Sequence, residues 1–149
     1  MPTSREPDIL IIGYGKTLRR DDGVGPHIAQ ILESWEHPRL RTHIAHQLTP
    51  ELAEPISQTD VVVFVDACRE SETEYEMREV SPGLDRGPSF HSARPEALVA
   101  LALELFGHAP QAWLLTVKGE DFSLGEGLNV ETQRRAVAAI ELLAGELLE

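Results

Sequence analysis

The chain has 149 residues, a length that fits one domain, and 42% of its residues are hydrophobic. Its 13 basic and 25 acidic residues give a net charge of −12, which repels phosphate backbones and favours a cationic partner over a nucleic acid. A single cysteine, Cys68, excludes an internal disulfide and gives no sign of an oxidising compartment. The polar first residues lack the apolar core of a signal peptide, and no apolar run is long enough to cross a bilayer. We therefore expect one domain over residues 1–149, in the cytoplasm and without a membrane partner.

Strand and helix patterns alternate along the first half of the chain. The aliphatic run over residues 8–14 predicts a strand, and a turn-rich segment follows it. A helix comes next, with apolar residues at spacings of three and four: Val24, Ile28, Ile31 and Trp35. Residues 40–48 alternate in character and predict a second strand. Thr49 and Pro50 then predict the N-cap and first position of a helix that ends near Ser57.

The second half of the chain continues the alternation. The strongest strand signal covers residues 60–67, an unbroken apolar run that suits a strand buried on both faces. Residues 75–80 predict a weaker strand at a sheet edge, and residues 81–94 predict a loop rich in Gly, Pro and Ser. Pro95 begins a helix that reaches about Phe106, and residues 112–117 predict another buried strand.

The chain ends in a predicted helix over residues 130–148. We expect one face of this helix to carry four apolar residues: Val137, Ile140, Ala144 and Leu147. Alternation of strands and helices predicts an α/β fold of three layers, in which a mostly parallel sheet has helices on both faces. Ligands of such sheets bind outside the carboxyl ends of the strands, which here follow Tyr14, Val65, Val80 and Val117.

The loop after the first strand, residues 13–25, carries two incomplete phosphate-binding patterns. The tripeptide that begins at Gly15 resembles the end of a P-loop, but the glycine that this motif requires five residues earlier is replaced by Leu10. A dinucleotide fingerprint would use Gly13 and Gly15, yet its third glycine position is Leu18. Neither pattern is complete, so acidic residues offer a third interpretation of this loop.

Three aspartates lie near the expected crevice. Asp21 and Asp22 precede the first helix, where carboxylates cap a helix or complement its dipole. We expect this structural role for Asp21, whereas for Asp22, which lies closer to the crevice, a structural and a functional role are both open. Asp66 ends the strongest strand, where it either forms a turn or acts as a ligand or catalytic carboxylate.

Histidine and cysteine supply the remaining candidates. His91 lies in the loop before the Pro95 helix, and it is open whether it is a metal ligand, a general base or a solvated side chain. Together, Asp22, Asp66 and His91 would form an O/O/N donor set that suits a borderline divalent ion with open positions for water or substrate. Cys68 could act as a nucleophile, but we expect it to be a packing residue.

Four segments, in chain order, resemble the motifs of the hydrogenase maturation proteases. The first is ILIIGYGKTLRRDDGVGPHIAQIL, with a glycine loop and an acidic pair between a strand and a helix. The others are HQLTPELAEPISQTDVVVFVDA, SFHSARPEALVALALELFG and VKGEDFSLGEGLNVETQRRAV, and together the four span nearly the whole chain. The chain departs from the family at Lys16, where asparagine is usual, and over residues 69–86, which match no motif. Lys16 could point away from the proposed cation site, contact a substrate carboxylate or alter specificity.

The resemblance implies a twisted five-stranded sheet between helices and a metal-dependent endopeptidase. It implies that the substrate is the large-subunit precursor of a nickel–iron hydrogenase, which loses a C-terminal extension after nickel insertion. It also implies that Asp22, Asp66 and His91 contact nickel supplied by that substrate, with no organic cofactor. Two alternatives remain open: a non-enzymatic nucleotide- or flavin-binding module, and a self-sufficient metallohydrolase.

Overall fold

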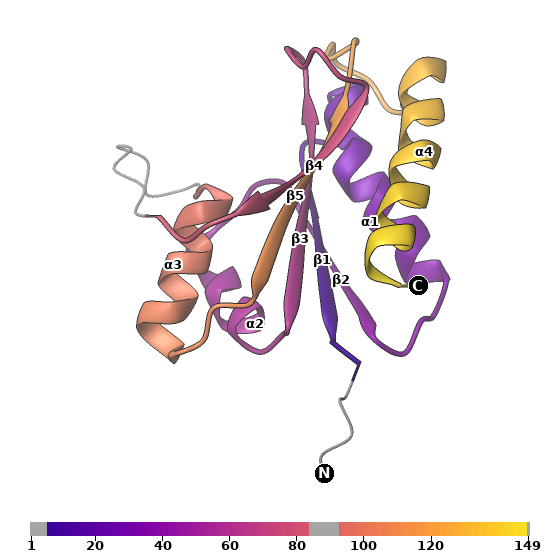
Figure 1. Ribbon diagram of the computed structural model, residues 1–149. Coiled ribbons are helices and arrows are strands. Elements are labelled where there is room, and N and C mark those ends of the chain that lie inside the picture. The colour runs from indigo at the N-terminus through magenta and orange to yellow at the C-terminus, as the bar shows by residue number, and fades with distance from the viewer. Residues whose placement is uncertain (1–5, 84–92, 149) are drawn as a thin grey trace.

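Five strands form one sheet within residues 6–83 and 93–148, the part of the chain that the computed structural model describes (Figure 1). The strands are β1 (Ile9–Tyr14), β2 (Leu40–Ala45), β3 (Val61–Cys68), β4 (Tyr75–Val80) and β5 (Gln111–Lys118). Their order across the sheet is β2-β1-β3-β5-β4. All neighbours are parallel except β4, which pairs antiparallel with β5 at the sheet edge. The mostly parallel sheet and the edge position of β4 are therefore confirmed.

Helices cover both faces of this sheet. On one face lie α1 (Val24–Ser34) and α4 (Val130–Leu147), and on the other lie α2 (Ala53–Ser57) and α3 (Pro95–Phe106) (Figure 1). Two short 3-10 helices, η1 (Arg20–Gly23) and η2 (Pro50–Leu52), lead into α1 and α2. The three-layer α/β architecture is thus confirmed. None of the helices in the described residues combines the length and apolar content needed to span a membrane.

Each face of the sheet has its own apolar core. Ile11 and Val63 point to the face covered by α1 and α4, where both are fully buried. Their neighbours Ile12 and Phe64 point to the other face and pack in the cluster beneath α2 and α3. Because successive residues of a strand alternate between faces, the unbroken aliphatic runs of β1 and β3 supply both cores.

Element boundaries lie close to those expected, and the largest difference is at β2. This strand ends at Ala45 rather than at residue 48. Pro50 occupies the first helical position as expected, but it begins the 3-10 turn η2 and not an α-helix. Thr49 occupies the N-cap position as predicted, with an extended backbone, although its side chain makes no capping hydrogen bond.

The predicted apolar faces of α1 and α4 are mostly buried, and Val137 and Trp35 are the exceptions. Val137 is 56% exposed, whereas Ala136, Ala139 and Leu143 of the same helix are fully buried. Ile140 is buried as predicted, but the core row of α4 runs through Ala136, Ala139 and Leu143 at helical spacing, which leaves Val137 on the adjacent row. In α1, Val24 and Ile28 are fully buried as predicted, and Trp35, the residue after the helix, is 44% exposed.

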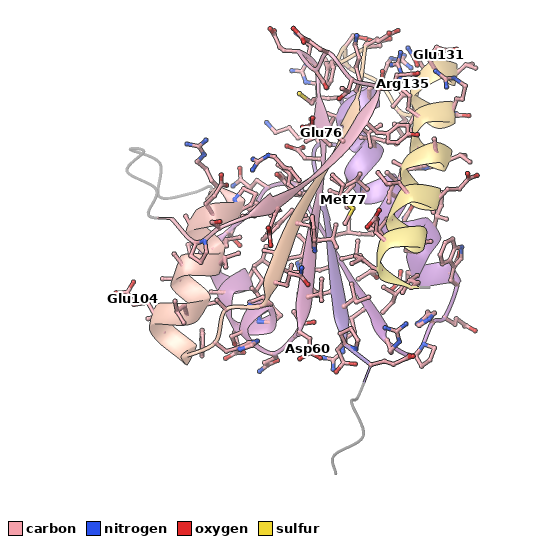
Figure 2. All side chains as sticks on the ribbon, in the orientation of Figure 1. Asp60, Glu76, Met77, Glu104, Glu131 and Arg135 are labelled. Atoms are coloured by element: carbon pink, nitrogen blue, oxygen red, sulfur yellow. The ribbon has the colours of Figure 1, made fainter. Side chains whose placement is uncertain are left out.

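Arg135 joins α4 to the sheet. Its side chain is 8% exposed, and its guanidinium donates to Glu74 at 3.0 Å and to Glu120 at 3.1 Å. It also donates to the carbonyl oxygen of Lys118, the last residue of β5, at 3.2 Å. Figure 2 shows Arg135 near the amino-terminal end of α4. One guanidinium therefore connects this helix to the end of β5 and, through Glu74, to the start of β4.

Replacing Arg135 should destabilise the fold more than replacing its neighbour Arg134. Arg135→Ala leaves Glu74 and Glu120 without their shared, largely buried partner, so we expect a loss of about 2–3 kcal/mol in the free energy of unfolding. Arg134 pairs with Glu74 and Glu131 but is 54% exposed, so Arg134→Ala should lower the free energy of unfolding much less than Arg135→Ala does. Urea denaturation of both variants measures the difference, and equal losses would contradict the role of Arg135.

Candidate active site

The loop between β1 and α1 lies tightly against the end of the sheet because its glycines have no side chain. Gly15 has a φ of 145°, and a Cβ atom there would clash with the carbonyl oxygen of Asp22. A Cβ atom at Gly25 would clash with the carbonyl oxygen of Val65 in β3, and one at Gly13 with that of Gly25. These glycines accommodate the chain's own backbone. This use argues against the phosphate-binding interpretations of the loop, in which they would make room for a nucleotide.

Asp66 lies within β3 and not in a turn. The strand continues to Cys68, and Asp66 remains paired with Thr116 of β5. β1, in contrast, pairs with β3 only as far as Val65, so Asp66 lies beyond the last β1–β3 pair. The turn-forming role that was open for Asp66 is therefore wrong, and its carboxylate stands at the carboxyl end of the sheet.

Two hydrogen bonds hold the Asp66 carboxylate. Its Oδ1 accepts from the N–H of Ala67 at 2.9 Å, and the hydroxyl of Tyr14 donates to the same carboxylate. Burial nevertheless raises the pKa of Asp66 to about 6, and the charge of Asp22 adds to the increase. Burial and the proximity of Asp66 also raise the pKa of Tyr14, so its hydroxyl remains a donor at neutral pH. A carboxylate with this environment is stabilised by a nearby cation.

Asp22 is held on the loop opposite Asp66. Its Oδ2 accepts from the backbone N–H of Lys16 at 2.6 Å, and its side chain does not cap α1. Repulsion from Asp22 contributes to the raised pKa of Asp66, so the two carboxylates interact. The structure thus brings together two of the three residues predicted to form the site.

The third predicted residue, His91, lies outside the described residues, and its role stays a prediction. The described chain resumes at residue 93, where the N–H of Ala93 donates to the carbonyl oxygen of Leu48 at 3.0 Å. Among residues 6–83 and 93–148, no three His, Cys, Asp or Glu side chains form a group that could hold a metal ion. Cys68 is half-buried at the end of β3, with a free thiol.

Asp21 has a structural role as predicted, but not the predicted one of capping a helix. This residue is fully buried, and it caps no helix. Its Oδ2 accepts from the N–H groups of Glu120 at 2.8 Å and Asp121 at 2.9 Å, and its Oδ1 accepts from that of Asn129 at 2.9 Å. Burial opposes ionisation, but these backbone donors outweigh it and hold the pKa of Asp21 below its ordinary value. Asp21 therefore ties the segment after β5 to the loop that carries Asp22.

The Leu-Gly-x-Gly-Leu turn, residues 124–128, braces the same loop. The N–H of Gly125 donates to the carbonyl oxygen of Leu18 at 2.9 Å, and the N–H of Arg20 donates to the carbonyl oxygen of Gly125 at 3.1 Å. The Arg20 guanidinium lies over Gly125 and donates to the carbonyl oxygen of Glu126 at 3.3 Å. Any side chain at position 125 would clash with this guanidinium. The glycine motif was visible in the sequence, but no spacing pattern relates it to a loop about 100 residues earlier.

Two pockets adjoin this loop. One, of about 340 Å³, has a mostly apolar surface, and its lining residues include Arg20, His27, Gln30 and Gln133. The other, of about 260 Å³, is lined by Lys16, Thr17, Leu18, Arg19, His46 and Leu124. Thr17 lines both, so the two pockets are neighbours on one side of the loop.

The chain shares its fold with solved hydrogenase maturation proteases. The crystal structure of the NiFe hydrogenase maturation protease HycI from Thermococcus kodakarensis is 25% identical, with a TM-score of 0.72 over 98% of this chain and 96% of HycI. The hydrogenase maturating endopeptidase HybD from E. coli is 18% identical, with a TM-score of 0.73 over 94% of this chain and 91% of HybD. A hydrogenase 2 maturation peptidase from a Thaumarchaeota archaeon is 18% identical, with a TM-score of 0.68 over 94% of this chain and 97% of the peptidase. No protein-family model and no curated protein sequence matches the chain. The resemblance carried by the four sequence segments is confirmed.

Asp21→Asn should weaken the fold at neutral pH and leave it less sensitive to acid. The native pKa of Asp21 is depressed, so its contribution to stability is complete above about pH 4 and is lost as the pH falls through the lowered native pKa. The side-chain amide of asparagine would also place its NH₂ group, a donor, next to backbone N–H groups that are donors too. We expect a loss of about 2–4 kcal/mol in the free energy of unfolding at pH 7, shrinking toward pH 3. Thermal unfolding followed by circular dichroism tests this, and a pH-independent difference would contradict it.

Asp66→Asn should have the opposite effect. The native pKa of Asp66 is raised from 3.8 to about 6, so the fold favours the protonated carboxyl. That contribution is complete below about pH 4 and is lost as the pH rises through about 6. The variant should therefore be more stable than the wild type by about 2–3 kcal/mol at pH 8, with little difference at pH 4. Denaturant titrations at the two pH values provide the comparison, and destabilisation at pH 8 would refute the prediction.

Proposed function

We propose that this chain is an endopeptidase that removes the C-terminal extension from the nickel-loaded large-subunit precursor of a nickel–iron hydrogenase. The proposal is supported by the fold shared with HycI and HybD and by four motif segments in the same order. The observation that carries it is the position of the Asp66 carboxylate at the carboxyl end of the sheet, where open α/β sheets bind their ligands and where the charge of Asp22 also acts on it.

The donor set fits a metal carried by the substrate. Two carboxylates that repel each other are relieved by a shared cation, and His91 would complete an O/O/N set of the kind that borderline divalent ions accept. Nickel in the precursor would act as a Lewis acid and as a mark that the precursor is ready for cleavage. Cleavage would then depend on nickel insertion, which is the logic of a maturation checkpoint.

Hydrolysis also needs a base for the attacking water. Either aspartate would accept this proton through a carboxylate oxygen that does not bind nickel, and burial raises the metal-free pKa of Asp66 to about 6. The hydroxyl of Tyr14 orients the Asp66 carboxylate. The water oxygen bonds to the carbonyl carbon, its proton passes through the carboxylate to the leaving nitrogen, and the C–N bond breaks. The products are a shortened large subunit with a new carboxyl terminus and a free extension.

Processing of the precursor in vitro tests the proposal. The purified protein is mixed with nickel-loaded and with nickel-free precursor, and cleavage is followed as a mass shift. We expect cleavage only of the nickel-loaded form, and equal cleavage of both would reject the checkpoint. Stable zinc in the purified protein, together with cleavage of free peptides, would favour a self-sufficient metallohydrolase, and tight co-purification of a flavin or nucleotide would favour a binding module.

Substitution of the two aspartates gives a sharper test. Asp66→Asn and Asp22→Asn should each lower kcat/KM for the nickel-loaded precursor by about 100-fold or more, because each removes a charge at the reacting centre. Glu104→Gln is the matched control, since Glu104 is exposed on α3 and points away from the sheet (Figure 2). Normal processing by Asp66→Asn would rule out its catalytic role. The cytoplasmic location remains a prediction.

A further inference from the structure

The pocket lined by Lys16, Thr17, Leu18, Arg19, His46 and Leu124 has an almost wholly apolar inner surface, so the charged ends of Lys16 and Arg19 lie outside that surface, and we refer to it as the basic–apolar pocket. Leu18 is 60% exposed and Leu124 is 71% exposed. The two leucines come from loops about 100 residues apart, and the hydrogen bond from the Gly125 N–H to the Leu18 carbonyl oxygen holds those loops together. The apolar surface is therefore preformed by the backbone, which is the usual condition of a binding pocket.

The charge of this pocket is opposite to that of the chain. Acidic residues outnumber basic ones 25 to 13 overall, yet the lining holds Lys16, Arg19 and His46 and no carboxylate. Within residues 6–83 and 93–148, neither Lys16 nor Arg19 makes an ion pair, whereas the neighbouring Arg20 lies 3.8 Å from Asp121. Exposed cations beside exposed leucines suit a ligand that combines an apolar side chain with a carboxylate.

The pocket also begins at the candidate active site. Lys16 lines it, and the backbone N–H of the same residue donates to Asp22 at 2.6 Å. An extended peptide advances about 3.3–3.6 Å per residue, so a substrate bound at Asp22 would reach the pocket within a few residues. Any C-terminal extension ends in a carboxylate, and acidic side chains within it would supply others. The extension therefore has the chemistry that the pocket selects.

We propose that the basic–apolar pocket binds the C-terminal extension of the precursor. An apolar side chain of the extension packs against Leu18 and Leu124, and a carboxylate pairs with Lys16 and Arg19. This inference rests on the proposed endopeptidase function and assigns a specificity role to Lys16, the residue at which the chain departs from the family pattern. The carboxylate comes either from the chain terminus or from an acidic side chain.

Steady-state kinetics of exposed-residue variants test the pocket. Leu18→Ala and Arg19→Ala should raise KM for the nickel-loaded precursor about five- to twentyfold and change kcat by less than about twofold, because they remove binding shared by ground state and transition state. Leu105→Ala is the matched control for Leu18, because Leu105 is 62% exposed on α3. Arg41→Ala, at an exposed position near the start of β2, is the control for Arg19. Thermal unfolding verifies that all four variants remain folded.

Fluorescence anisotropy identifies the source of the carboxylate. The probes are fluorophore-labelled peptides of the extension: the free acid, the C-terminal amide, and a form whose acidic side chains are replaced by amides. Either the C-terminal amide or the amidation of the acidic side chains should weaken peptide binding to the wild-type protein about tenfold. The double variant Lys16→Ala/Arg19→Ala should bind the free acid and that modified peptide equally well. If neither modification changes binding to the wild type, the carboxylate pairing is wrong.

The outcomes separate the two proposals. Cleavage of the nickel-loaded precursor by the wild type, but not by Asp66→Asn, supports the endopeptidase function. If Leu18→Ala and Arg19→Ala then both keep the wild-type KM, the pocket proposal is wrong and the endopeptidase proposal is unaffected. If the wild type fails to cleave nickel-loaded precursor, the proposed function and the pocket's role in it are both rejected. Raised KM in Leu18→Ala and Arg19→Ala, with unchanged controls, supports both.

Discussion

A buried carboxylate organises the functional end of this protein. Asp21 is fully buried, yet it stays ionised because three backbone N–H groups from residues 120–129 point at its two oxygens. Those bonds hold the segment after β5 against the β1–α1 loop. Asp22 is the next residue, so its position depends on the same anchor. Removing the charge at Asp21 would leave the three N–H donors of residues 120–129 without their charged acceptor on the other loop.

At neutral pH the candidate site lowers the stability of the folded protein, whereas the structure around it raises that stability. Asp66 is partly buried and faces the charge of Asp22, so at neutral pH its ionised form is disfavoured in the native state. The hydrogen bonds from Ala67 and Tyr14 offset only part of this cost. Apolar cores on both faces of the sheet, and the guanidinium of Arg135, supply stability elsewhere. Such strain at a carboxylate pair is typical of sites that bind a cation or carry out proton transfer.

One loop carries both proposed functions. Its glycines let the chain turn closely over β1 and β3, which brings Asp22 toward Asp66. The same loop presents Lys16, Leu18 and Arg19 to the basic–apolar pocket. Binding of the extension and alignment of the reacting bond would therefore share one rigid support. In a chain with a net charge of −12, neither of the two pockets beside this loop has an acidic lining residue.

The sequence by itself determined the elements and the fold class, because strand and helix periods depend on neighbouring residues: β4 and α3 match their predicted bounds. It also placed Asp22 and Asp66 at the sheet's carboxyl end, since parallel strands all end at that edge. Only the tertiary structure decided that Asp21 is a buried anchor, that Val137 faces solvent, and that residues 16–19 and Leu124 form one pocket. These outcomes depend on contacts across about 100 residues of chain and on how closely helices pack, and no local pattern encodes either one.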